Sequence, residues 1–210
     1  MKCFVINLDR RPDRLERFNT NFGGLFEITR ERAIDGRQLR ITPQLKPRIN
    51  EWNFKYLHLE KIKSITALCL THLNIWKKIS KMDTERYVFV FEDDCVFINE
   101  GVQNNFKEYF DSLVLPPDFG LIWLNGKIQD KPGEKSGPPF QVKQFTEDTT
   151  TESYAVTPQF AKELVFAIEN NLGAVDAHMG QYTRKINKMS YKVFPPFFCQ
   201  FDRRDTDIQI

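Results

Sequence analysis

The sequence predicts an α/β fold in which helices flank a largely parallel central sheet. The chain opens with a strand, a loop and a helix, strand-like and helix-like segments alternate after that, and one strand-like run at residues 87–91 is apolar throughout. Alternation of strands and helices favours parallel pairing. A strand without polar positions is typical of a sheet that is covered on both faces. At 210 residues, these elements fit a single domain with one sizeable core.

The first part of the chain supplies two strands, a helix and a connection. Residues 3–8 form a short apolar run, and Pro12 suits the first turn of a helix. Residues 26–33 alternate in polarity as a second strand and end at Asp35-Gly36, a strong turn dipeptide. The prolines and the mixed polarity of residues 37–63 predict a connecting excursion at the surface.

The rest of the chain continues the alternation. From Ser64 onward, apolar residues recur every three or four positions, which predicts a helix with one buried face. Further elements follow in order: a strand at 87–91, a helix at 102–113, strands at 119–124 and 153–157 separated by a Pro- and Gly-rich loop at 131–139, and helices at 158–171 and 176–187.

Composition places the chain among globular proteins. Hydrophobic residues make up 41% and charged residues 28%, which excludes a disordered or fibrous class. The 30 Lys and Arg residues nearly balance 28 Asp and Glu residues, so the net charge of +2 argues against a dedicated nucleic-acid binder. The first 50 residues are locally basic, with 11 Lys and Arg against 6 Asp and Glu. That excess fits either a surface that faces phosphates or an ordinary solvated one.

The cysteines and the apolar segments bear on location. Cys3, Cys69, Cys95 and Cys199 stand apart in apolar surroundings, without the spacing of a metal or disulfide motif, which predicts reduced thiols in the core. The sequence opens without a signal peptide and has no run of 18 apolar residues. We therefore expect no transmembrane segment and a cytoplasmic location.

Three acidic residues, Glu92, Asp93 and Asp94, directly follow the apolar strand. In open α/β sheets, ligands bind outside the carboxyl ends of the strands. Crowded carboxylates repel one another, and a hard divalent cation such as Mg²⁺ or Mn²⁺ removes the repulsion and can bridge diphosphate oxygens. On an extended backbone, Glu92 and Asp94 would point to one side and Asp93 to the other. The alternative is an acidic turn that caps the helix after it.

Short segments spread over most of the chain form an ordered set of motifs. They are residues 5–11 with Arg14 and Arg17, then 33–36, 67–76, 92–94, 153–156, 174–176, and 194–196 with Gln200. Together they resemble glycosyltransferase family 25, which contains lipopolysaccharide and collagen galactosyltransferases. Thr71-His72 stands where the family has Ser-His, so the hydroxyl is kept, while the usual Gly and Cys before that pair are replaced around Ile65-Thr66-Ala67.

The resemblance implies a GT-A-type, Rossmann-like fold and a single glycosyltransferase domain over residues 1–210, with a nucleotide-sugar-binding half at 1–125 and an acceptor-side half at 126–210. It also implies a metal-dependent, inverting transfer of a hexose from a UDP-sugar donor. Galactose is favoured, with glucose and N-acetylglucosamine as alternatives. The acceptor hydroxyl would belong to a glycan, a lipid-linked glycan or a collagen-like protein, and no nucleic-acid partner is expected.

The same resemblance assigns roles to residues. Mn²⁺ or Mg²⁺ would be held by Asp94 with Asp93 and would meet the charge that grows on the departing diphosphate. Asp176 is the candidate general base for the acceptor hydroxyl, with the N-cap of a helix as its alternative role. The candidates for donor binding are Asn7, Asp9, Arg10, Arg14, Thr71, His72, Glu92 and Asp93.

Several of these assignments have structural alternatives. Arg10 can also be a surface arginine at a helix start, and His72 a core histidine on an amphipathic helix. Tyr154 and Trp123 can stack on sugar rings or fill the core. Two other classes of protein compete with an active glycosyltransferase: a metal-dependent phosphohydrolase or nucleotidyltransferase, and a noncatalytic nucleotide-sugar-binding domain.

Overall fold

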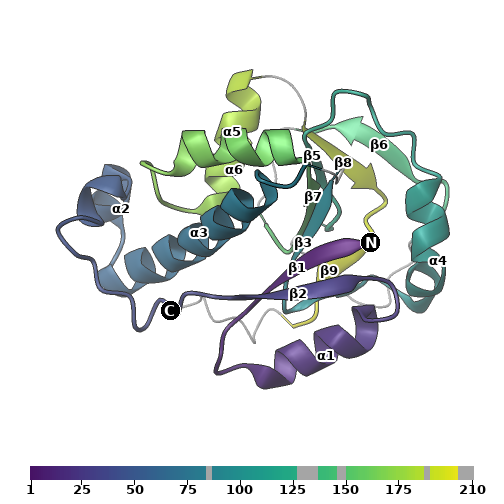
Figure 1. The fold of residues 1–210 in the computed structure, drawn as a ribbon, viewed down its shortest axis with the longest axis horizontal. Coiled ribbons are helices and arrows are strands. Elements are labelled where there is room, and N and C mark those ends of the chain that lie inside the picture. Colours follow the sequence, from purple (N-terminus) through teal and green to yellow (C-terminus); the bar gives the residue numbers. More distant parts are fainter. Residues whose placement is uncertain (84–86, 127–136, 146–149, 187–189, 203–210) are drawn as a thin grey trace.

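A seven-stranded sheet forms the centre of the computed structural model, which describes residues 1–83, 87–126, 137–145, 150–186 and 190–202 (Figure 1). The strands lie in the order β2-β1-β3-β7-β5-β8-β6. Their bounds are β1 Lys2–Asn7, β2 Glu27–Arg32, β3 Val88–Glu92, β5 Leu121–Trp123, β6 Gln141–Gln144, β7 Ser153–Val156 and β8 Ser190–Phe194. Five strands run in one direction, whereas β6 and β7 run in the other. The predicted largely parallel sheet is therefore confirmed.

Helices cover both faces of this sheet (Figure 1). On one face, three helices pack against one another: α3 (Leu59–Ile79), α5 (Pro158–Ile168) and α6 (Val175–Ile186). On the other face lie α1 (Pro12–Phe22), α4 (Glu100–Asp111) and a two-stranded sheet made of β4 (Cys95–Phe97) and β9 (Phe198–Gln200). A 3-10 turn, Lys46–Arg48, and the short helix α2 (Glu51–Tyr56) precede α3. Within the described residues, no helix has the length and apolarity to cross a membrane.

The pleat of β3 divides the core between the two faces. Val88 and Val90 belong to a buried cluster with Trp76 of α3, whereas Phe89 and Phe91 belong to a second cluster with aromatic side chains of α1 and α4. Successive side chains of a strand point to opposite faces, so a run without polar positions buries both. The prediction of a central strand covered on both sides is confirmed.

Some elements differ from the sequence prediction. The helix predicted from Ser64 begins at Leu59, because Leu59 and Glu60 are exposed in its first turn and give no buried periodicity there. The connection predicted at 37–63 therefore holds α2 and the start of α3. β7 is present, but it pairs antiparallel with both neighbours. The loop predicted at 131–139 lies outside the described residues as far as position 136.

The strands bring several chain segments to one edge of the sheet. β1 and β3 are parallel neighbours, with Ile6 opposite Glu92, so both end at this edge. β7 runs the other way, with Ser153 opposite Phe91, so its amino end comes to the same edge. The segments that follow β1 and β3 and the segment that precedes β7 therefore meet there.

Candidate active site

A cavity of about 450 Å³ opens at this edge of the sheet. Its wall comes from the loop after β1, the turn after β2, the first half of α3, the acidic segment after β3, the residues before β7 and the start of α6. Both halves of the chain, 1–125 and 126–210, contribute to it. The polar and charged lining residues are Arg10, Arg14, Asp35, Arg37, Lys61, Ser64, Thr71, Glu92, Asp93, Asp94, Thr150, Thr151, Glu152, Asp176 and Gln200.

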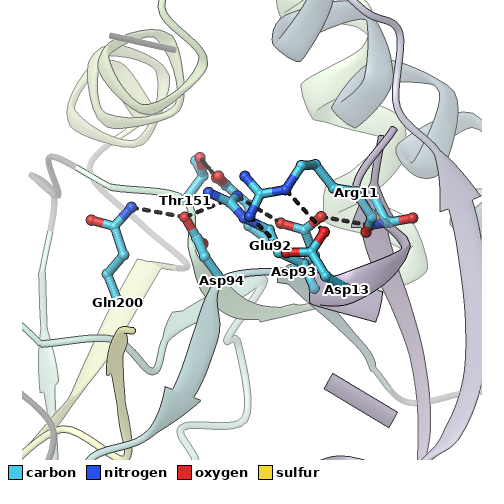
Figure 2. A network of polar contacts seen from close by, with 9 residues as sticks. Arg11, Asp13, Glu92, Asp93, Asp94, Thr151 and Gln200 are labelled. Atoms are coloured by element: carbon cyan, nitrogen blue, oxygen red, sulfur yellow. Dashed lines mark hydrogen bonds and ion pairs between the residues drawn. The ribbon is translucent and has the colours of Figure 1, made fainter. Parts of the chain in front are cut away.

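Asp93 and Asp94 share one guanidinium group, that of Arg14 on α1. Arg14 Nη1 lies 3.0 Å from Asp93 Oδ1 and 3.6 Å from Asp94 Oδ2. Asn7 Nδ2 donates to the other oxygen of Asp93 at 2.7 Å, and Gln200 Nε2 donates to Asp94 Oδ2 at 2.8 Å. Figure 2 shows Gln200 reaching Asp94 from the side away from Asp93. A buried arginine thus offsets part of the repulsion between the two carboxylates.

The three acidic side chains do not point in the directions that the strand pattern predicts. Glu92 contacts α3 and Asp93 contacts α1, as expected of neighbours on a strand, but Asp94 lies with Asp93 at Arg14. The expected alternation is wrong at Asp94, because β3 ends at Glu92 and the backbone turns at the two aspartates. The alternative of a helix cap is also wrong, because the acidic segment leads into β4 and Asn99 caps α4.

Glu92 connects the cavity to a buried polar network. Thr151 Oγ1 donates to Glu92 Oε1 at 2.6 Å, and His72 Nε2 lies 3.9 Å from the same oxygen. His72 Nδ1 is 2.8 Å from the Tyr154 hydroxyl, which accepts from Trp76 Nε1 at 2.9 Å. Burial opposes ionisation of Glu92, but the contacts with His72 and Thr151 outweigh it and hold the pKa of Glu92 below its usual value. An ionised carboxylate therefore borders the cavity here.

Ionisation is more costly for the two aspartates. Burial raises the pKa of Asp93 above its usual value, against the opposing contacts with Asn7 and Arg14. At Asp94, burial together with the negative charge of Glu92 raises the pKa to about 7. A cationic ligand would lower the cost of these charges, so the cluster favours one.

The two aspartates are unequal as ligands for a divalent cation. Both oxygens of Asp93 are engaged, one by Arg14 and the other by Asn7. Asp94 Oδ1 is buried and has no hydrogen-bond partner in the part of the chain that the structure describes. In that same part, no group of three or more His, Cys, Asp or Glu side chains is arranged to hold a metal ion. Because Mg²⁺ is often held by one or two carboxylates together with substrate phosphates, Asp94 fits that mode of binding.

Five of the donor-binding candidates line the cavity: Arg10, Arg14, Thr71, Glu92 and Asp93. Thr71 is engaged on two sides, because its Oγ1 donates to Ala67 O at 2.9 Å and accepts from Ile34 N at 3.0 Å. The turn after β2 is thereby attached to α3. Gly36 of that turn packs so closely that an added Cβ would lie 2.6 Å from Ser64 Cα. The turn and the helix together form one wall of the cavity.

The other three candidates, Asn7, Asp9 and His72, are not among the described residues that line the cavity. Asn7 is buried beneath it and supports Asp93. Asp9 pairs with Arg30 and Arg32, at 2.7 and 2.6 Å. His72 is buried behind Glu92. The structure therefore places these three side chains beside the cavity rather than on its surface.

Asp176, the candidate base, lies in the first turn of α6 and lines the cavity. Its Oδ1 accepts a hydrogen bond from the N–H of Ala177 at 2.8 Å. The predicted alternative, an N-cap, is wrong, because Asp176 is the second residue of α6 and the residue before the helix is Ala174. The side chain contacts the backbone of the first turn and also borders the space that the acidic cluster borders.

Sequence reasoning missed Thr151 and Glu152, which line the cavity just before β7. They belong to no recognisable motif, and a strand parallel to β3 would place them at the opposite edge of the sheet. Because β7 is antiparallel, the carbonyl of Glu152 instead accepts from the N–H of Glu92 at 2.9 Å. The suggestion that Tyr154 or Trp123 stacks on a sugar is wrong, because both side chains are fully buried.

The fold has counterparts among solved structures. A mutant of Drosophila beta-1,4-galactosyltransferase 7 in complex with manganese, UDP-Gal and xylobiose matches with a TM-score of 0.51 and 10% identity, covering 100% of this chain and 75% of that chain. Mouse xyloside xylosyltransferase 1, in its apo form, matches with a TM-score of 0.36 and 7% identity, covering 90% of this chain and 70% of that chain. No curated protein matches the chain.

The protein has the GT-A fold of glycosyltransferases, with a charged cavity at the carboxyl ends of its parallel strands. The sequence model of glycosyltransferase family 25, described as LPS biosynthesis protein, matches residues 1–179. The chain belongs to this family and is a glycosyltransferase, so the resemblance found in the sequence is confirmed.

Proposed function

We propose that the chain is a metal-dependent, inverting hexosyltransferase that moves a sugar from a UDP-sugar donor to an acceptor hydroxyl. The observation that carries the proposal is the position of Asp94. This carboxylate is buried at the cavity, is held through Oδ2 by Gln200, and keeps Oδ1 without a partner in the described residues. Mn²⁺ or Mg²⁺ bound at Asp94 would neutralise the charge that grows on the leaving diphosphate.

The cationic side of the cavity supports the binding of a diphosphate. Three cationic side chains line the cavity together with the acidic cluster: Arg10, Arg37 and Lys61. Arg10 Nε pairs with Asp35 Oδ2 at 3.1 Å, which fixes the direction of its side chain. Guanidinium groups contact phosphate oxygens in pairs, so Arg10 is our first candidate for a diphosphate contact.

Asp176 is the proposed general base. Its carboxylate would take the proton of the acceptor hydroxyl as the acceptor oxygen bonds to the anomeric carbon and the bond from that carbon to the diphosphate breaks. The start of a helix favours a negative charge, so the position at the beginning of α6 helps to keep Asp176 ionised and able to accept the proton.

The donor sugar and the acceptor are proposals as well. UDP-Gal is the first donor to test, because the similar Drosophila protein is a galactosyltransferase whose structure contains UDP-Gal. UDP-glucose and UDP-N-acetylglucosamine are the alternatives. The acceptor would be a glycan, a lipid-linked glycan or a collagen-like protein. We also propose a cytoplasmic location, which agrees with four buried cysteines outside any disulfide.

The test is release of UDP from these three donors, with and without Mn²⁺, by the wild type and by Asp94→Asn. We expect one donor to be turned over only with the metal, and Asp94→Asn to lose at least about 100-fold in rate. Asp111→Asn, an exposed change on α4, is the matched control. Turnover that survives chelation of the metal would overturn the metal dependence. Thermal stabilisation by UDP-sugars without turnover would indicate a noncatalytic binding domain, and hydrolysis of simple phosphate esters would indicate a phosphohydrolase.

A further inference from the structure

The exposed large apolar side chains of the molecule are concentrated in one short segment. Of the seven such side chains in the described residues, four lie within positions 52–59: Trp52, Phe54, Tyr56 and Leu59. Trp52 and Tyr56 are 58% and 56% exposed, and their ring centroids are 4.9 Å apart. α2, which carries three of the four, lies at one end of the molecule, away from α4 and β6 (Figure 1). Clustered exposed apolar side chains of this kind mark interaction surfaces.

The same part of the chain is strongly basic. Residues 37–63 contain seven Lys and Arg against two Glu, a net charge of +5, whereas the rest of the chain contains 23 Lys and Arg against 26 Asp and Glu, a net charge of −3. We call residues 37–63 the basic-aromatic segment. Its cations stand among its aromatic rings: Lys55 Nζ lies 5.0 Å from the ring centre of Tyr56, and Lys46 Nζ 5.9 Å from that of Phe54.

We propose that the basic-aromatic segment is a docking surface for the anionic headgroups of a lipid bilayer. Trp and Tyr prefer the boundary between headgroups and acyl chains, where the ring is apolar on one side and wet on the other. Basic side chains beside them are attracted by the negative potential of anionic lipids. The charge of the segment is complementary to such a surface, whereas the remainder of the chain would be repelled by it.

The proposed docking surface adjoins the cavity. Arg37 and Lys61 belong to the segment and also line the cavity, and Ser64, which directly follows the segment, lines it as well. Docking through the segment would therefore hold the cavity close to the headgroups, where a lipid-linked acceptor could reach it. The docking itself does not rest on the proposed transfer reaction.

A soluble glycan is the competing partner, because aromatic rings also bind sugars. The four exposed apolar side chains are absent from the lining of the described cavity. Small ligands bind in concave sites with a few converging polar groups. Phe54 and Leu59 have no polar group with which to orient a sugar, whereas both suit insertion among lipids. The side-chain chemistry therefore favours the bilayer.

The experiment is cosedimentation of the full chain with vesicles of phosphatidylcholine, with and without phosphatidylglycerol. We expect binding only when phosphatidylglycerol is present, and weaker binding at high salt, because salt screens the attraction. The protein also carries its own reporter. Its other tryptophans, Trp76 and Trp123, are fully buried, so a blue shift of the emission on vesicle binding reports Trp52. Trp52→Phe should keep binding and lose most of the shift.

Two double variants test whether binding depends on this particular surface or on exposed apolar and charged side chains anywhere on the protein. Lys46→Glu with Lys55→Glu should weaken vesicle binding by at least about tenfold, since each basic side chain near an anionic surface contributes about fivefold. Trp52→Ser with Tyr56→Ser should also weaken it. The matched controls lie on α5: Lys162→Glu for charge, and Phe166→Ser, whose side chain is 90% exposed, for apolar exposure.

Three results would overturn the proposal. The first is no binding to the anionic vesicles, and the second is an equal loss in the α5 controls. The third is a Trp52→Ser variant that binds vesicles normally but has a higher KM for a soluble glycan acceptor. That result would show that the segment binds sugars. Because UDP release is measured without vesicles, failure of the docking surface and failure of the transferase activity are distinguishable.

Discussion

Arg14 and Asp93 form a buried ion pair, with Arg14 Nη1 3.0 Å from Asp93 Oδ1. Only 5% and 9% of the two side chains are exposed. The pair joins α1 to the end of β3, and the same guanidinium reaches Asp94 at 3.6 Å. The position of the acidic cluster therefore depends on α1 as well as on the strand that carries it.

Replacing Arg14 with Met should destabilise the protein strongly. Removal of one partner from a buried pair leaves a charge without compensation, which costs about 3–5 kcal/mol. Arg14→Lys keeps the charge and should cost less. Urea denaturation measures both, and Lys107→Met, which removes an exposed pair with Asp111, should leave the midpoint almost unchanged. A stable Arg14→Met variant would show that the aspartates are protonated or otherwise compensated in the native state.

Asp94 should make the metal-free protein less stable as the pH rises. Burial and the charge of Glu92 raise the pKa of Asp94 from 3.8 to about 7, so the folded state holds this proton more tightly than the unfolded state does. The resulting stability is fully present below pH 3.8 and is lost as the pH rises through about 7. Metal-free Asp94→Asn lacks this loss, so at pH 8 its free energy of unfolding should exceed that of the wild type by on the order of a few kcal/mol and its melting temperature should be higher. The difference should shrink toward pH 5.

Mn²⁺ should reverse that ranking. A ligand that binds only the folded state raises the free energy of unfolding by RT ln(1 + L/Kd), where L is the free ligand concentration, so the effect grows with the ratio of that concentration to Kd. We expect Mn²⁺ with UDP to raise the melting temperature of the wild type at pH 8 and to leave that of Asp94→Asn nearly unchanged. The same shift in both proteins would place the metal away from Asp94.

Gly36 should not tolerate a larger side chain. An added Cβ would lie 2.6 Å from Ser64 Cα and 3.0 Å from Ser64 N, both of them backbone atoms of α3 that cannot rotate away. Gly36→Ala should therefore cost about 1–3 kcal/mol and weaken donor binding, because the turn and the helix form one wall of the cavity. Gly24→Ala is the control, since a Cβ there meets nothing within 4 Å. Equal stability of the two variants would refute the close packing.

The sequence could predict the layers of this fold but not the direction of every strand. The apolar run at 87–91 encodes burial on both faces, and the acidic cluster is visible because it directly follows that run. β7 is fully buried over Ser153–Val156, and such a pattern is the same for either direction of the strand. The direction decides which edge receives Thr151 and Glu152, so these two residues were missed.

Long-range contacts explain the rest of what the sequence does not show. Gln200 and Asp94 are 106 positions apart, and their hydrogen bond exists because β9 pairs with β4, which places Gln200 opposite Cys95. The position of Asp94 at Arg14 depends on a backbone turn that the alternation of a strand does not contain. His72 could be placed on the buried face of its helix, but its position behind Glu92 follows only from the pairing of α3 with the sheet.

Asp176→Asn separates the two roles of this side chain. Asn is as good an acceptor as Asp for a backbone N–H at the start of a helix, so the contact with Ala177 and the stability of α6 should be kept. Asn cannot take the proton of an acceptor hydroxyl. If Asp176 is the base, kcat for transfer should fall by about 10²–10⁴ while the KM for the UDP-sugar stays nearly constant. Asp176→Ala would remove both roles and should in addition lower the melting temperature. A normal kcat in Asp176→Asn would leave this residue only its contact with the first turn of α6. It would direct the search for the base to Glu152, a carboxylate that the antiparallel strand β7 brings to the cavity.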